Sequence, residues 1–210
     1  MSPDSGWHTL HLPWQTESTA PASRLSPEVR WRIEGGALVW EMRLPLPLAG
    51  PGTFRTDADG FTEGLWTQDV AEGFIAEAGT GHYTEYNLSP AGAWWACCYT
   101  APRLRRSPQP DWERTGILAE TVWTETHWLG RMICPLPPGA RRVGGAGAAG
   151  RTGGSSGESE AGGEVVPARF AVNFTAVVAT ETMREYHSLA RIGGGERPDF
   201  HRLAGWIPLG

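Results

Sequence analysis

The sequence predicts an all-β protein, an antiparallel β-sandwich of immunoglobulin-like jelly-roll type that forms a single domain over residues 1–210. Three observations support this class. Several short runs alternate apolar and polar residues, Gly- and Pro-rich turns separate the runs, and no window of helical length shows a convincing 3.6-residue period. A chain of 210 residues is long enough to bury one ordinary hydrophobic core.

The amino-terminal region supplies two predicted strands. The first alternates over residues 7–12 and ends at Pro13, and a proline-dotted connection follows it. The second begins after Gly36 and buries one face, which consists of Leu38, Trp40, Met42 and Leu44. In the loop that follows, Asp57-Ala58-Asp59-Gly60 resembles the start of a calcium loop. The EF-hand spacing fails after the glycine, so we interpret this motif as a turn.

The central stretch, residues 65–99, contains three predicted neighbouring strands of one meander. The strands cover residues 70–76, 83–87 and 93–99, and residues 79–81 and 87–92 supply the reversals between them. This stretch also holds three of the eleven tryptophans of the chain.

The carboxyl-terminal half continues the β pattern around one insertion. Residues 117–136 read as one long strand, residues 170–178 as a half-buried strand, and short strands fall near 186–190 and 205–209. Residues 139–167 are dominated by Gly, Ala, Ser, Arg and Glu, which predicts a disordered, low-complexity loop within the domain. Its G-x-G-x-x-G and G-x-S-x-G matches are rejected, because neither lies on a strand-to-helix turn.

Composition excludes several function classes. The net charge of −5 argues against nucleic acid as a partner. The chain contains no lysine, which removes P-loop and Schiff-base chemistry. The three cysteines have no metal-binding spacing, so we expect reduced thiols. Because the sequence shows no secretory signal and no apolar stretch of membrane-spanning length, we expect a cytoplasmic protein without a membrane partner.

Two groups of motifs, one central and one near the carboxyl end, resemble a known family. The first is Leu65-Trp66, Asp69-Val70-Ala71-Glu72-Gly73-Phe74-Ile75 and the run from Tyr83 to Trp94; the second is Tyr186-His187-Ser188-Leu189-Ala190 with Arg197-Pro198-Asp199-Phe200-His201. Together they resemble the DOMON-like proteins related to family 9 carbohydrate-binding modules. The resemblance implies a β-sandwich and a sugar gripped between tryptophans, while related DOMON domains hold haem. His187 stands where the family tends to have tryptophan, and Arg191 where it tends to have histidine.

Adjacent Trp94 and Trp95 are the main physical clue to a binding surface. On a regular strand they point to opposite faces, so we expect at most one of them in the core and the other free to stack on a sugar. Glu72, Glu85 and Asn87 could hydrogen-bond sugar hydroxyls, although an outward polar row, with Glu72 in an ion pair with an arginine, is the structural alternative.

The run from Pro198 to His201 has two interpretations. It is either a structural turn, with Phe200 in the core, or a binding edge that presents Asp199 and His201. A patch formed by Trp123, Glu125 and His127 is explained by core and solvent faces. The candidate ligand-binding residues are Trp66, Glu72, Glu85, Asn87, Trp94, Trp95, His187, Asp199 and His201; no residue is assigned a catalytic or metal-binding role.

The sequence therefore favours a module that binds a mono- or oligosaccharide without catalysis and needs no cofactor. Three alternatives stay open. The first is a haem- or metal-dependent redox protein with ligands among Met42, Met132, Met183 and the six histidines, or with calcium. The second is a scaffold whose insertion recruits a protein partner. The third is a glycoside hydrolase-associated activity, which would require a pair of carboxylates at the right distance.

Overall fold

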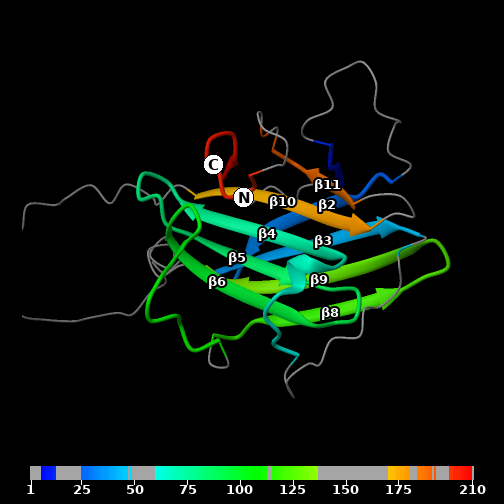
Figure 1. Ribbon diagram of the computed structural model, residues 1–210, viewed down its shortest axis with the longest axis horizontal. Coiled ribbons are helices and arrows are strands. Elements are labelled where there is room, and N and C mark those ends of the chain that lie inside the picture. Colours follow the sequence, from blue (N-terminus) through cyan, green and yellow to red (C-terminus); the bar gives the residue numbers. More distant parts are fainter. Residues whose placement is uncertain are drawn as a thin grey trace, which may run out of the picture.

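The computed structural model describes residues 6–12, 25–46, 48, 60–112, 115–136, 170–179, 184–190, 192 and 199–209. In this part of the chain two antiparallel sheets lie face to face (Figure 1), which confirms the predicted β-sandwich. The described residues include the short 3₁₀ turn η1 (Leu65–Thr67) and contain no helix long and apolar enough to cross a membrane. The predicted insertion at 139–167 and most of the Asp57–Gly60 turn lie outside the described residues.

The first sheet, sheet A, has the strand order β1-β2-β3-β9-β8. Its strands are β1 (His8–Thr9), β2 (Glu28–Glu34), β3 (Ala37–Pro45), β8 (Leu118–Trp123) and β9 (His127–Pro135). All its pairs are antiparallel, and β3 pairs with β9 over nine residues. Its outer face carries a solvated network in which Glu41 accepts a hydrogen bond from Arg30 and forms longer ion pairs with Arg32 and Arg131.

The second sheet, sheet B, has the order β11-β10-β4-β5-β6-β7, with β12 paired to β10. Its strands are β4 (Val70–Glu77), β5 (Tyr83–Leu88), β6 (Trp94–Ala101), β7 (Leu104–Arg105), β10 (Phe170–Ala179), β11 (Arg184–Ser188) and β12 (Ile207–Leu209). The predicted meander of residues 70–99 is confirmed as β4, β5 and β6, which are neighbours in the sheet.

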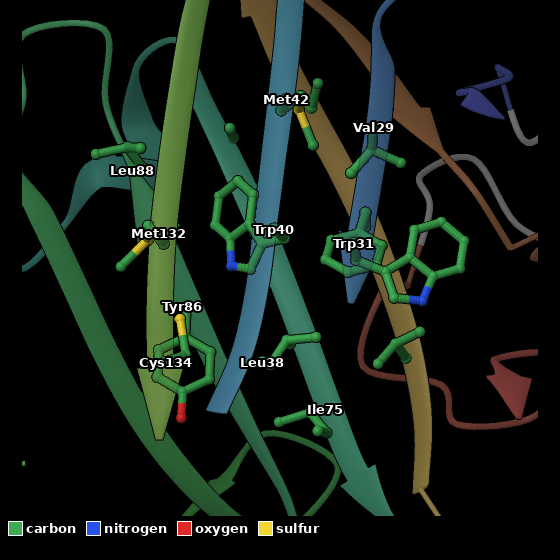
Figure 2. Close-up of a cluster of buried hydrophobic side chains, with 14 of the residues drawn as sticks. Val29, Trp31, Leu38, Trp40, Met42, Ile75, Tyr86, Leu88, Met132 and Cys134 are labelled. Carbon is green, nitrogen blue, oxygen red and sulfur yellow. The ribbon is translucent and has the colours of Figure 1, made fainter. Parts of the chain in front are cut away.

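The main core lies between the two sheets. Figure 2 shows part of it, with Trp40 and Met42 of β3 and Met132 of β9 lying across from Tyr86 and Leu88 of β5. Two strand glycines make room for indole rings: a Cβ on Gly73 would meet Trp40 at 2.9 Å, and one on Gly130 would meet Trp128 at 2.3 Å. Only glycine at these two positions therefore leaves room for the indole rings where they lie.

A second core covers the outer face of sheet B. It gathers Phe74, Tyr83 and Trp95 from the sheet, and Phe200 and Trp206 from the carboxyl-terminal segment. Sheet B is consequently buried on both faces. The prediction that residues 170–178 form a half-buried strand is wrong for this reason, since every residue from Val172 to Val178 is buried.

Two other predictions need correction. Residues 28–34, assigned to a connection, form β2, and their alternation of Val29, Trp31 and Ile33 with charged residues is a strand signal that the prolines upstream obscured. Residues 117–136, assigned to one strand, form the hairpin β8–β9. The turn between its strands is closed by Thr124, whose amide N–H and hydroxyl both donate to the His127 carbonyl at 2.8 and 2.9 Å.

Candidate functional site

The outer face of sheet B carries a row of polar side chains. Strand register places Thr175 of β10 beside Glu72 of β4, Glu72 beside Asn87 of β5, and Asn87 beside Trp95 of β6. Because alternate residues of a strand share a face, Glu85, which lies two residues before Asn87 in β5, is on this side too. We call Thr175, Glu72, Asn87 and Glu85 the polar row.

The polar row is buried and only partly hydrogen-bonded. Glu72 and Glu85 are each 4% exposed and Asn87 is fully buried. The Thr175 hydroxyl donates to Glu72 Oε2, and Asn87 Nδ2 donates to Glu85 Oε1 at 3.1 Å. Within the described residues Glu85 Oε2 and Asn87 Oδ1 have no hydrogen-bond partner. The predicted ion pair of Glu72 with an arginine is thus replaced by a bond to a hydroxyl.

Two further polar atoms on the same face are donors that find no partner among the described residues. They are Asn173 Nδ2 of β10 and Trp206 Nε1 of the covering segment, both buried. Asn173 faces Phe74 across the β10–β4 pair, and Trp206 packs on Phe74 with ring centroids 5.6 Å apart. The outer face of sheet B therefore offers both acceptors and donors that the described part of the protein leaves unsatisfied.

Burial perturbs the two carboxyl groups of the polar row. Burial and, to a smaller extent, the neighbouring Glu85 raise the pKa of Glu72 to about 8, against the opposing effects of the Thr175 hydroxyl and Arg184. Burial also raises the pKa of Glu85, against the effect of hydrogen bonds from Tyr99 and Asn87. Glu72 therefore holds a proton at neutral pH, and the polar row carries less negative charge than two ionised glutamates would.

His201 reaches the polar row from the carboxyl-terminal segment. The Tyr83 hydroxyl accepts from the Arg103 amide at 3.0 Å and lies 2.7 Å from His201 Nδ1, so its own proton points to that nitrogen. The histidine proton then sits on Nε2, which is 3.9 Å from Glu85 Oε2. Burial lowers the pKa of His201 to about 4, so the ring is neutral.

Asp199 lies at the rim of this face. Its Oδ1 accepts from Arg103 at 3.1 Å, and both side chains are about half exposed or more. Phe200 packs in the second core, as the structural interpretation of this run expects. His201 lies by the polar row, and the interpretation of Asp199 and His201 as a binding edge stays a prediction. His187 lies elsewhere: it pairs with Ala176 on the inner side of sheet B, and its Nε2 is 2.9 Å from Glu185.

The tryptophan pair behaves only partly as predicted. Trp94 and Trp95 do point to opposite faces, since Trp94 joins the core between the sheets and Trp95 the second core. Neither is available as an exposed platform, because they are only 6% and 3% exposed. The reason is that sheet B is covered on both sides, which a single strand pattern does not reveal.

Trp66 is the exposed indole at this face. It lies on η1, which follows Gly64 in the left-handed conformation, and it is 38% exposed. Its ring packs edge-on against Trp95 at 5.0 Å, while the Arg105 guanidinium lies 5.1 Å from the Trp95 ring centre. Trp66 and Arg105 thus both contact Trp95, which pairs with Asn87 of the polar row.

Sequence reasoning missed several residues of this face, including Thr175, Tyr83, Tyr99 and Arg105. Alternation does place Thr175 opposite the apolar face of β10, but which strands pair with β10 cannot be seen in the sequence. Only the antiparallel register of β10 with β4 brings the Thr175 hydroxyl to Glu72. Tyr99 and Tyr83 stack at 4.7 Å through the register of β5 with β6 in the same way.

The metal and haem alternatives stay predictions, and the structure places their suggested ligands as follows. These contain no group of three or more His, Cys, Asp or Glu side chains placed to hold a metal ion. Met42 and Met132, suggested as haem ligands, are fully buried between the sheets. Met183 lies outside the described residues.

A separate cavity of about 650 Å³ lies on the inner side of β5 and β6. Its walls are mostly apolar and include Tyr86, Cys98, Trp112, Pro110 and Leu136. Its lining also includes polar side chains such as Thr84, Thr100 and Gln109. Within the described residues, however, no buried polar side-chain atom of this lining lacks a hydrogen-bond partner, so we regard the outer face as the candidate site.

Comparison with known proteins shows the fold class. No protein-family model matches the sequence, and no curated protein matches it. The chain shares the fold of a Bacteroides uniformis protein described as a "putative carbohydrate-binding protein", with a TM-score of 0.64 and 16% identity over 97% of this chain and 84% of that one.

Weaker matches are a family 9 carbohydrate-binding module from Caldicellulosiruptor kristjanssonii in two complexes, both at 10% identity. The glucose complex has a TM-score of 0.46 over 88% of this chain and 75% of that one. The cellotriose complex has a TM-score of 0.44 over 96% and 80%, respectively.

Proposed function

We propose that this protein binds a carbohydrate without catalysis, on the outer face of sheet B between Trp66 and the polar row. The observation that carries the proposal is an exposed indole beside buried polar atoms that lack partners. A sugar ring presents C–H groups that stack on an indole and hydroxyls that both donate and accept. The unpartnered atoms, two acceptors and two donors, match that mixed chemistry.

Two independent likenesses support the proposal. The fold is shared with the Bacteroides uniformis protein described as a "putative carbohydrate-binding protein". The motifs from Leu65 to Trp94 resemble those of DOMON-like proteins related to family 9 carbohydrate-binding modules. Fold alone does not define a ligand, so the argument depends on the side chains of the outer face.

A saccharide approaches from the side of Trp66, where the rim is open to solvent. The side chains of Arg103, Arg105 and Asp199 are about half exposed or more at this rim. The polar row itself is shielded from solvent, since Phe200 and Trp206 belong to the second core that covers this face of sheet B. Binding therefore begins on the Trp66 ring and ends with hydroxyl groups in contact with the polar row.

Calorimetric titration with a panel of mono- and disaccharides tests the proposal. We expect Trp66→Ala to weaken binding by about tenfold, which corresponds to the loss of one aromatic stacking contact of about 1.4 kcal/mol. Trp123→Ala is the matched control, because Trp123 is 41% exposed but lies on sheet A. Replacing Trp94 or Trp95 would not serve, since both are core residues whose truncation to alanine costs about 3–5 kcal/mol of stability.

Failure to bind any saccharide of the panel, with the wild-type protein folded, would refute the proposed function. Equal weakening by Trp66→Ala and Trp123→Ala would refute the proposed location. Hydrolysis of a disaccharide during the titration would instead indicate catalysis, with Glu72 and Glu85 as the carboxyl pair to test.

A further inference from the structure

Within the described part of the chain, no cation is bonded to either carboxyl group of the polar row. Among the described residues, the arginines of the rim are committed elsewhere, Arg103 to Asp199 and Arg105 to Glu63. Arg184 influences Glu72, and Arg105 and Arg103 influence Glu85, only through their fields, without a bond in the described structure. Two buried carboxyl groups in such proximity are ordinarily accompanied by a positive charge, because an isolated buried carboxylate is costly.

Two atoms of the polar row lack a hydrogen-bond partner among the described residues, and both are acceptors. Glu85 Oε2 and Asn87 Oδ1 are buried and lack a donor within the described residues. The Nε2–H of His201, at 3.9 Å, is too distant to bond to Glu85. A buried acceptor without a donor destabilises the protein, so a ligand group that complements these two acceptors is one that donates hydrogen bonds.

We propose that the ligand carries a protonated amine, as a hexosamine does, and that this amine binds at Glu85 and Asn87 beside Glu72. The inference rests on the proposed function and specifies its ligand. An ammonium group has three N–H donors and no acceptor, whereas a hydroxyl has one donor and two lone pairs. It also brings the positive charge that the carboxyl pair lacks, and charge-assisted bonds are roughly twice as strong as neutral ones.

The titratable and charged groups that face the carboxyl pair predict how binding depends on pH. They are Tyr83 of β5, Cys97 and Tyr99 of β6, Arg105 of β7, Arg184 of β11, and Arg103, Asp199 and His201 at the rim. In the empty site burial raises the pKa of Glu72 to about 8, so this group is protonated below that pH. A bound ammonium lowers that pKa, so binding releases a proton and becomes tighter as pH rises from 6 to 8.

The test is calorimetric titration of the full chain with glucosamine, N-acetylglucosamine and glucose at pH 6, 7 and 8. N-acetylation removes the charge of the amine and leaves the rest of the sugar ring in place. We expect glucosamine to bind at least about tenfold more tightly than the other two sugars at pH 7. Titrations in two buffers of different ionisation enthalpy should show proton release with glucosamine alone.

Variants locate the amine. Glu85→Gln keeps a hydrogen-bonding side chain but removes the charge, and it should abolish the preference for glucosamine while glucose still binds. Glu120→Gln is the matched control, because Glu120 pairs with Arg131 on the outer face of sheet A. It should keep the full preference.

The outcomes separate this inference from the proposed function. If glucose binds and glucosamine binds no more tightly, the amine is wrong and carbohydrate binding stands. If the preference survives in Glu85→Gln, the location is wrong. If none of the three sugars nor the wider panel binds, both proposals fail.

Discussion

Glu72→Gln should stabilise the protein at neutral pH, because the buried carboxyl group opposes folding there. In the unfolded chain Glu72 has its ordinary pKa of 4.5, whereas burial raises the folded value to about 8. At pH 7 the folded group retains a proton that the unfolded group would release, because pH 7 lies 2.5 units above the unfolded pKa of 4.5 and below the folded pKa of about 8. At 1.36 kcal/mol per unit this lowers the stability by about 3 kcal/mol.

The sign of the pH dependence follows from the same shift. A carboxyl group with a raised folded pKa contributes its full stability below pH 4.5, loses it steadily as the pH rises, and loses no more above about pH 8. Glutamine keeps the size of the side chain and an oxygen that can accept from the Thr175 hydroxyl. The variant and the wild type should therefore be equally stable near pH 4.5 and diverge toward pH 8.

Urea unfolding followed by tryptophan fluorescence at pH 4.5, 6, 7 and 8 measures this divergence. We expect a gap of about 3 kcal/mol at pH 7 in favour of Glu72→Gln, from the shift worked out above. Glu120→Gln is the control, since Glu120 is exposed and its removal should leave the curves parallel. Parallel curves for Glu72→Gln as well would refute the assignment of a buried, protonated carboxyl group at this position.

Two further predictions concern the frame of the site. Gly130→Ala places a methyl group 2.3 Å from the buried Trp128 ring, so it should lower the stability by about 3 kcal/mol and the Tm by roughly 6–12 °C. Gly6→Ala is the control: an added Cβ there has nothing within 4 Å, so the Tm should not change. An unaltered Tm for Gly130→Ala would contradict the packing of Trp128 on Gly130. Asn173→Ala removes the buried oxygen that accepts from the Ser188 hydroxyl and the Ala190 amide, so urea unfolding should show a free energy of unfolding lower by about 1–3 kcal/mol. A decrease below roughly 0.5 kcal/mol would show that these hydrogen bonds contribute little to stability.

Strand alternation was sufficient to predict much of the fold. The inward face of β3, with Trp40 and Met42, and the β4–β5–β6 meander follow from local alternation and turn residues. Alternation failed at β2, where the upstream prolines suggested a connection, and at the β8–β9 hairpin, where it continues through the turn. A period of two residues marks a strand and its two faces, but not the point at which the chain reverses.

The candidate site divides in the same way. Trp66, Glu72, Glu85 and Asn87 could be named from the sequence because they lie together in one stretch of strands and turns. Which tryptophan is exposed could not be named, since that depends on what covers sheet B. The covering residues Phe200 and Trp206 lie more than a hundred positions away in the chain.

The sequence by itself thus determined that the chain forms antiparallel strands and that Trp94 and Trp95 face opposite ways, because side-chain direction is a local property of the backbone. Only the tertiary structure decided that both rings are buried and that Trp66 meets solvent. It also decided that Thr175 bonds to Glu72 and that His201 lies near Glu85. Burial and partnership depend on strand register and on contacts between segments distant in sequence, which no local pattern encodes.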